Sequence, residues 1–250
     1  MAIRAVMRAL AVFDCFSQKQ PKLSLHEISE KLELAKSTTF RLVGTLVETG
    51  YLIQLEDQRY CISMKLLRLG GLVQSTLNVR DIAVPEMREI NSSTGETVVL
   101  TVLAGEQRTA LEVLESVSPL KLVFQVGDTV SLRIGAVGRV FLAHHPEINV
   151  DNVFKDKSEK NSINPPTTAE LNKIRAQGFD YLAGTRAPGA ASVAVPIFDI
   201  NDMNTHCLSI AGPESRILEN KQPFIELIRA AAARISTQLG SAALPVIPTE

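Results

Sequence analysis

The chain has few of the residues that mark secreted, metal-binding or membrane-spanning proteins. It has no tryptophan, few aromatic residues (5%) and only three cysteines, Cys15, Cys61 and Cys207, in 250 residues. Because the cysteines show neither CxxC nor metal-ligand spacing, we expect reduced and mostly buried thiols. No apolar run approaches the roughly 20 residues that cross a bilayer. The amphipathic N-terminus contains charged residues and no small-residue cleavage site follows it, which predicts a cytoplasmic protein without a signal peptide.

Motifs of the common enzyme classes are also missing. The sequence contains no GxSxG elbow, no GxxxxGK[ST] or GxGxxG loop and no HExxH motif. Two adjacent histidines, His144 and His145, would point about 100° apart on a helix, so they do not form a chelating pair. We therefore expect no metal, no cofactor and no catalysis.

Charge is nearly balanced but unevenly distributed. The net charge is −1, yet residues 1–76 hold ten Lys and Arg against seven Asp and Glu, whereas the remainder holds 16 against 20. A weakly basic N-terminal part and an acidic remainder suit a nucleic-acid-binding module joined to a second module. So small an excess supports few phosphate contacts per copy, and we expect a dimer or higher oligomer.

Apolar spacing predicts two helices before residue 33. The first is expected from Ile3 to Phe16, with a core stripe at helical spacing. The second begins after Ser24, which forms a capping box with Glu27. The predicted buried positions are Ile3, Val6, Leu10 and Phe13 in the first helix and Leu25, Ile28 and Leu32 in the second.

A third helix, beginning near Ala35 or Lys36 after a short break, has two distinct faces. Its apolar face holds Thr39, Leu42, Val43 and Leu46, and its polar face holds Ser37, Arg41 and Gly44. Gly50 is expected to end it in the left-handed conformation. Two helices separated by so short a turn are typical of a helix-turn-helix, whose second helix enters the major groove of DNA.

The polar face supplies the candidate DNA contacts. Lys36, Ser37 and Thr38 lie in the first turn, where free amides favour a phosphate. Arg41 is the candidate for reading guanine, the alternatives being a phosphate or an intramolecular Glu. Phe40 borders both faces, so core packing and contact with a thymine methyl or sugar remain open.

Two β-prone segments follow the third helix. Tyr51–Ile53 and Tyr60–Ile62 flank the polar turn Glu56–Gln58, which predicts a hairpin of the kind called a wing. Arg59, near its tip, is a candidate for contact with the DNA backbone or minor groove.

Beyond residue 63 the pattern predicts an α+β domain. We expect a linking helix from Leu66 to about Ser75, a helix over Val79–Ser93, and an antiparallel sheet with further helices packed on it. The expected strands are TVVLTVLAG, RTALEVLES, LKLVFQVGD, SVAVPIFD and CLSIAGP, and the expected later helices are GAVGRVFLAHH, Thr168 to Gly178 and Pro223–Leu239.

The segments LSLHEISEKLELAKSTTFRLVGTLVETGYL and RYCISMKLLRLG resemble the helix-turn-helix, wing exit and linker helix of the IclR family of bacterial transcriptional regulators. The resemblance covers most of the chain. It implies a winged helix-turn-helix over residues 1–63, a linker helix over 64–77, a GAF-like effector-binding domain over 78–240 and a tail over 241–250.

Two further segments, SLRIGAVGRVFLA and GAASVAVPIFDINDMNTHCLSIAGP, are similar to the family's pocket helix and central strands. Carried over position by position, the resemblance implies effector contacts from Gly135, Ala136, Val137, Ala190, Ser192, Ser209 and Ala211. Arg133, Arg139 and Leu182 depart from the family's usual residues, which suggests a pocket less polar than those tuned to the smallest ketoacids.

Several of these residues also have a purely structural interpretation. Ser192 and Ser209 alternatively bond backbone groups, and Arg133 and Arg139 alternatively pair with local acids. The Gly135–Gly138 spacing alternatively serves close helix packing, and Cys207 is more often a core residue than a pocket residue.

The resemblance implies a ligand-responsive regulator, a repressor in the first interpretation, of a catabolic operon. It would bind a palindromic operator as a homodimer or dimer of dimers, with a small organic acid, semialdehyde or aromatic acid as effector. The alternative is an architectural or protein-interaction module with a vestigial winged helix.

Overall fold

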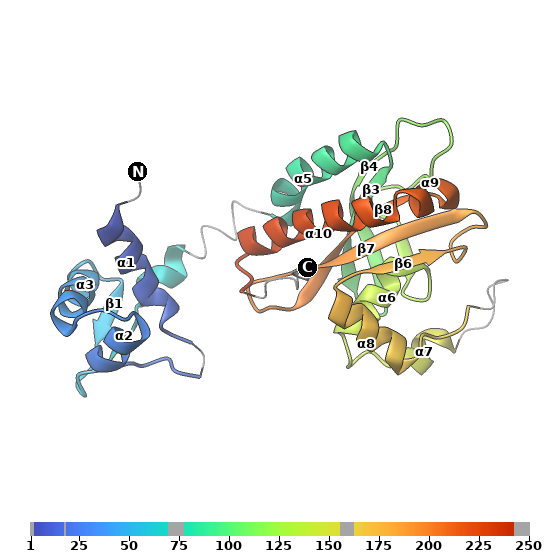
Figure 1. The fold of residues 1–250 in the computed structure, drawn as a ribbon. Helices are drawn as coiled ribbons and strands as arrows, with labels where there is room; N and C mark the ends of the chain where they lie inside the picture. Colours follow the sequence, from blue (N-terminus) through green and yellow to red (C-terminus); the bar gives the residue numbers. More distant parts are fainter. Residues whose placement is uncertain (1–2, 18, 70–77, 156–162, 243–250) are drawn as a thin grey trace. The chain divides into compact units, whose positions relative to one another are not determined.

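The computed structural model describes residues 3–17, 19–69, 78–155 and 163–242 (Figure 1). The chain folds into two units, Met1–Leu77 and Asn78–Glu250. Residues 64–69 are helical, whereas the rest of the expected linking helix and the tail beyond residue 242 lie outside the described residues. Among the helices that the structure describes, none is both long and apolar enough to span a membrane.

In the part of the N-terminal unit that the structure describes, three helices precede a two-stranded antiparallel hairpin, which a bridge between Leu23 and Tyr60 extends, and the helical residues 64–69 follow it. Ser24 and Glu27 form the predicted capping box, and Gly50, with φ of 77°, follows the last turn of the third helix. Both predictions are confirmed. The elements are α1 (Arg4–Asp14), α2 (Leu25–Lys31), α3 (Lys36–Glu48), β1 (Leu52–Gln54) and β2 (Tyr60–Ile62).

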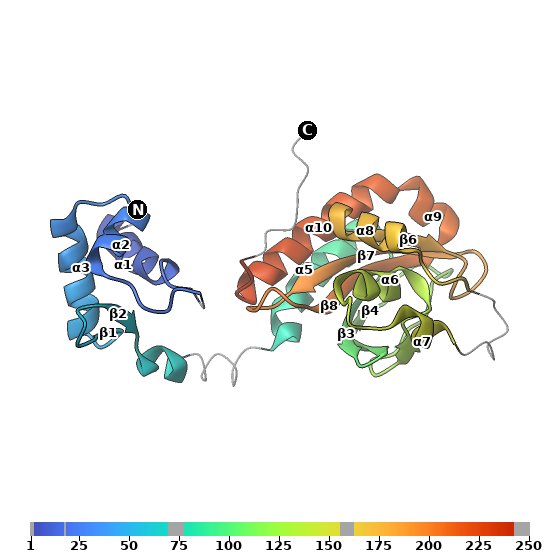
Figure 2. The same ribbon diagram turned by 90° about the horizontal axis from the view of Figure 1, so that it is seen from below.

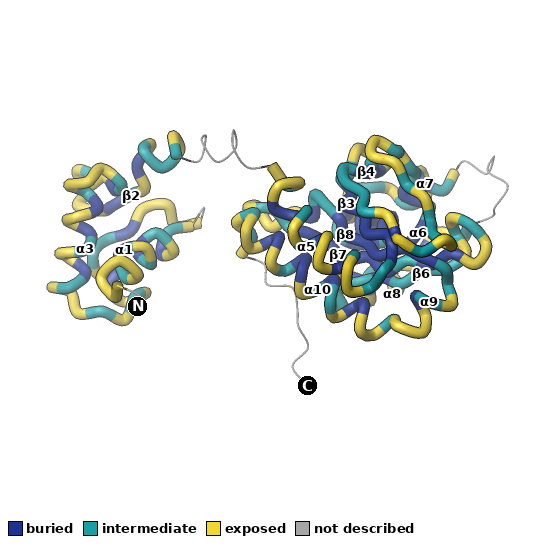
Figure 3. The backbone as a smooth tube through the Cα atoms, turned by 90° about the horizontal axis from the view of Figure 1, so that it is seen from above, coloured by how far each residue is buried: buried dark blue, intermediate teal, exposed yellow. Residues whose placement is uncertain are grey.

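The core of this unit lies between the three helices and the hairpin (Figure 3). Helices α2 and α3 bury the predicted faces, with Ile28 and Val43 fully inaccessible. The stripe predicted on α1 is wrong at three of its four positions, because Ile3, Val6 and Leu10 are 68%, 52% and 60% exposed, whereas Phe13 packs against the core and Val12 is fully buried. Helical spacing identifies an apolar face but not what covers it, and the described residues do not cover this one.

The C-terminal unit is built on one six-stranded antiparallel sheet with the order β5-β4-β3-β8-β7-β6. Its two longest strands, β7 and β8, are interior strands that pair with each other over most of their length. The strands are β3 (Thr97–Ala104), β4 (Gln107–Leu114), β5 (Thr129–Ser131), β6 (Asp180–Ala183), β7 (Ala190–Phe198) and β8 (Asn204–Pro213).

Helices cover both faces of this sheet (Figures 1 and 2). Helices α5, α9 and α10 enclose one apolar core, and α6, α7 and α8 enclose the other. An α+β fold was predicted, and the structure has it. The helices are α5 (Val79–Thr94), α6 (Gly135–His144), α7 (Val150–Phe154), α8 (Thr168–Gln177), α9 (Glu214–Glu219) and α10 (Lys221–Gln238).

One strand prediction in this unit is wrong. Residues 120–128 do not join the sheet, and the short strand Thr129–Ser131 pairs with β4 in their place. The apolar residues of the segment face two ways, since Leu122 and Phe124 line a cavity whereas Val123 is 58% exposed. The alternating apolar residues of 120–128 therefore mark a segment that covers the cavity, called the covering segment below, and not a strand. The short elements β6, α7 and α9 were not predicted from the sequence.

Candidate DNA-binding face and ligand cavity

Helix α3 presents its polar face to solvent as predicted. Thr39 is fully buried and its hydroxyl donates to the Ala35 carbonyl, whereas Ser37, Arg41 and Gly44 are exposed. Ala35 provides no side-chain cap, so the first amides of the helix are free of a capping side chain. Lys36 and Ser37 lie beside these amides, in the positive field of the helix N-terminus, where an anion is favoured.

Arg41 projects from this face one turn further along. No ion pair with a carboxylate holds its guanidinium within the described residues, so the intramolecular Glu considered above is excluded there. Thr38 is half-buried beside it, and together with Ser37 and Leu42 these side chains line a shallow groove against α1. The face therefore combines an unpaired guanidinium with small hydroxyls, the donors that read base edges and phosphates.

Phe40 does not pack in the core, because 60% of its surface is exposed. The core alternative is therefore wrong. Phe40 therefore adds an exposed ring to the surface of α3.

Arg59 is held within the wing. Its Nε and Nη2 atoms lie 2.8 and 2.6 Å from Asp57 Oδ2. This pairing lowers the pKa of Asp57. Both side chains are about half exposed, so the pair is a weak surface interaction that a phosphate can replace at little cost.

A cavity lies in the C-terminal unit, on the face of the sheet that α6 covers. Because side chains alternate along a strand, one face of β3, β7 and β8 presents Val99 opposite Ser209, and Ser192 opposite Ala211. Alanine and serine at adjoining positions leave space above the sheet. The enclosed space measures about 30 Å³ and is covered by Leu122, Phe124 and the start of α6.

The predicted effector residues gather at this cavity with one exception. Gly135, Val137, Ala190, Ser192, Ser209 and Ala211 line it, whereas Ala136, in the first turn of α6, is fully buried in the core. Gly135 has φ of +75°, a conformation that favours glycine. Gly138 serves packing, because a Cβ there would collide with the backbone of Leu132.

The structure decides some of the open alternatives. Ser209 makes a long hydrogen bond of 3.4 Å to the Val99 carbonyl, whereas the Ser192 hydroxyl has no partner in the part of the chain that is described. Arg139 forms ion pairs with Asp180 and Glu170 at 3.1 and 3.3 Å, so local acids hold it. Cys207 is a core residue, and burial raises its pKa to about 12.

Among the lining residues that the sequence analysis missed, two are charged. Arg108, on β4, and Arg186, in the loop before β7, both line the cavity. These two cations lie among mostly apolar lining side chains, and the lower polarity relative to pockets tuned to the smallest ketoacids stays a prediction. Arg186 stacks on the ring of Phe124, with its Cζ 4.2 Å from the ring centroid. The residues around Arg108 and Arg186 in the sequence do not distinguish either arginine from a surface residue. Because side chains alternate between the two faces of a strand, Arg108 can be placed on the cavity side only once the register of β4 is known.

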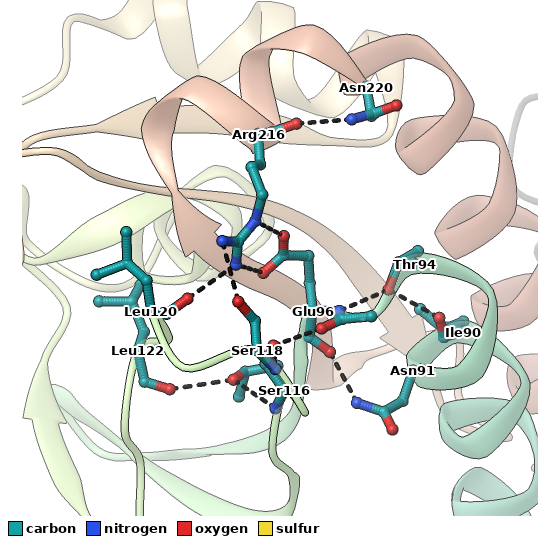
Figure 4. A network of polar contacts seen from close by, with 12 residues as sticks. Ile90, Asn91, Thr94, Glu96, Ser116, Ser118, Leu120, Leu122, Arg216 and Asn220 are labelled. Atoms are coloured by element: carbon teal, nitrogen blue, oxygen red, sulfur yellow. Dashed lines mark hydrogen bonds and ion pairs between the residues drawn. The ribbon is translucent and has the colours of Figure 1, made fainter.

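A polar network holds the covering segment in place (Figure 4). Thr97 accepts a hydrogen bond from the Ser116 amide at 3.1 Å and donates one to the Leu122 carbonyl at 3.0 Å. Arg216 donates to the Leu120 carbonyl at 2.9 Å and to the Ser118 hydroxyl at 3.3 Å. These hydrogen bonds hold the start of the segment in place, and its residues Leu122 and Phe124 line the cavity.

Two family models match the chain and together cover both units. Residues 5–56 match the IclR helix-turn-helix domain, and residues 72–237 match the bacterial transcriptional regulator IclR C-terminal domain. The chain belongs to the IclR family of bacterial transcriptional regulators. Its N-terminal unit is a DNA-binding helix-turn-helix domain and its C-terminal unit an effector-binding domain.

Relatives of known name share this organisation along nearly their whole length. The chain is 25% identical to the HTH-type transcriptional regulator KdgR of Escherichia coli (strain K12), over 96% of this chain and 94% of KdgR. It is 27% identical to KipR of Bacillus subtilis (strain 168), over 95% and 97%. The relatives are named as regulators, and the family is not enzymatic.

Solved structures show the same fold. The Thermotoga maritima IclR structure superposes with a TM-score of 0.60 at 28% identity, covering 96% of this chain and all of that one. HmgR of Pseudomonas aeruginosa gives a TM-score of 0.76 at 24% identity, covering 96% and 99%. The second similarity is one of fold alone.

Proposed function

We propose that this regulator is a ligand-responsive repressor of a catabolic operon that binds a palindromic operator. The observation that carries the DNA-binding part is the exposed face of α3, where Arg41 has no carboxylate partner in the described residues and Ser37 and Thr38 lie beside uncapped amides. In this proposal Arg41 contacts base edges. Lys36, Ser37 and Thr38 contact phosphates, and Phe40 and Arg59 lie at the edge of the interface.

The binding species in this proposal is a homodimer or a dimer of dimers. The apolar face of α1, with Ile3, Val6, Met7 and Leu10 each more than half exposed, supports burial against a second copy. The weak positive charge of residues 1–76 supports the same conclusion, because two copies double the phosphate contacts. Two symmetric α3 helices then read the two halves of an inverted repeat.

The effector in this proposal occupies the cavity beneath α6 and is a small organic acid, semialdehyde or aromatic acid. Six of the carried-over residues meet there, around small side chains that leave room for a ligand. A ligand that favours one arrangement of the paired winged helices changes operator affinity by its coupling free energy.

A footprint on the DNA upstream of the gene tests the proposal. Protection of an inverted repeat at moderate salt is expected, and its absence contradicts operator binding. The competing function, an architectural module with a vestigial winged helix, predicts no sequence preference and no effect of Arg41→Ala.

A further inference from the structure

Arg108 is a buried cation at the wall of the cavity. It lies on β4, paired with Val130 of β5, and only 7% of its surface is exposed. Its Nη2 donates to the Ile134 carbonyl at 3.0 Å, and its buried Nε has no hydrogen-bond partner in the described residues. A donor that is buried and unused in this way is costly, and its position needs an explanation.

The surroundings of Arg108 provide no negative charge. No Asp or Glu is among the described residues that line the cavity, and the second charged group there is another cation, Arg186. Burial, more than the charge of Arg186, lowers the pKa of Arg108 to about 10. The guanidinium is therefore still charged at neutral pH, without a counter-charge, in a place where a leucine would pack at lower cost.

The other groups at the cavity suit an anion as well. Helix α6 begins at Gly135, whose amide donates to the Thr185 hydroxyl at 3.1 Å, and its N-cap residue Ile134 adds no side-chain bond. The dipole of this first turn favours negative charge beside Arg108. The Ser192 hydroxyl is available as a further donor, and Val99 and Val137 provide apolar wall. The enclosed space of about 30 Å³ corresponds to roughly two water positions.

We infer that the effector is a compact organic anion whose carboxylate is bound by the Nε side of Arg108, next to the first turn of α6. This inference rests on the proposed function of the cavity and selects among the ligand classes given above. Arg186 is exposed at the rim and stacked on Phe124, so it contributes attraction that salt screens, whereas Arg108 binds the anion away from water.

Thermal unfolding of the full chain with paired probes tests the inference. Formate, acetate, lactate and pyruvate are each compared with the corresponding neutral amide, and benzoate represents the aromatic acids. At least one small carboxylate is expected to raise the Tm, and its amide is expected not to do so. Stabilisation by an amide as large as by its acid, by benzoate alone, or by none of the probes overturns the inference.

Variants identify the residue responsible. Arg108→Gln is expected to lower the affinity for the stabilising carboxylate by about 30-fold or more, and Arg186→Gln is expected to lower it by less than about fivefold. Arg88→Gln, an exposed arginine of the same unit on α5, is the matched control and leaves affinity unchanged. Without ligand, Arg108→Gln is expected to raise the Tm, because it removes an uncompensated buried charge. A lowered Tm together with unchanged carboxylate affinity assigns Arg108 a structural role and overturns the inference.

Operator binding separates this inference from the proposed function. The same variants are tested for anisotropy with the upstream DNA. If the protein binds that DNA but responds only to neutral compounds, the regulator function stands and the anion site fails. If it does not bind the DNA at all, the proposed function fails whatever the probes do.

Discussion

Arg216 of α9 is paired with the buried carboxylate of Glu96, with Nε 2.5 Å from Oε1 and Nη2 2.9 Å from Oε2 (Figure 4). The Glu96 side chain is 3% exposed, whereas that of Arg216 is about one-third exposed. Gly212 of β8 lies so close to Glu96 that a Cβ would collide with the carboxylate. The pair therefore positions Arg216, which in turn holds the start of the covering segment that carries Leu122 and Phe124.

Arg216→Met is expected to lower the free energy of unfolding by about 3 kcal/mol, because it leaves Glu96 buried without its cation. It also releases the Leu120 carbonyl and the Ser118 hydroxyl, so binding of any cavity ligand is expected to weaken. Urea denaturation gives the first quantity and calorimetry the second. Adding Glu96→Gln restores much of the stability if the lost charge pair is the cause. No gain in the double variant would contradict the assignment.

Gly44 is in the middle of α3 although a Cβ there would meet nothing within 4 Å. Glycine inside a helix costs about 1 kcal/mol relative to alanine, so Gly44→Ala is expected to stabilise α3 by about that amount. Hydrogen exchange of the α3 amides measures the gain. If the missing side chain allows close approach to DNA, the same variant binds the operator more weakly. A variant that is stabler and binds DNA unchanged would remove Gly44 from the interface.

Burial raises the pKa of Asp180 from 3.8 to about 6, although Arg139 opposes the shift. The folded state therefore binds the proton more tightly, and stability falls as pH rises between these values. Relative to Asp180→Asn, the wild type is expected to lose on the order of 3 kcal/mol from pH 3.8 to neutral. Urea unfolding of both proteins across this range measures the difference. A constant difference would show that folding leaves the pKa of Asp180 unshifted and would contradict the prediction.

The local parts of the fold were predictable because their determinants are local. The Ser24 capping box, the buried face of α3 and the left-handed Gly50 depend on residues within a turn of one another. The apolar face of α1 was identified as helical but wrongly placed in the core. Periodicity alone does not distinguish a face buried within the chain from one left for a partner.

The cavity was predictable only in part. The family resemblance predicted six of the lining residues, but it did not predict Arg108, which lies far from Ser192 in the sequence. Which face of β4 Arg108 occupies depends on a register shift between Leu100 and Thr101 in the β3–β4 pair. Such irregularities arise from tertiary packing, so short-range patterns do not reveal them.

The central claim, that α3 reads an operator, is tested most directly by anisotropy of the labelled upstream duplex at one fixed salt concentration. Wild type, Arg41→Ala and the control Arg68→Ala, an exposed arginine outside α3, are titrated in parallel, and thermal unfolding checks their folding. Arg41→Ala is expected to bind at least about tenfold more weakly with an unchanged Tm, since a good bidentate base contact contributes about 1–3 kcal/mol. Arg68→Ala is expected to bind like the wild type. Equal binding by Arg41→Ala and wild type would contradict the account.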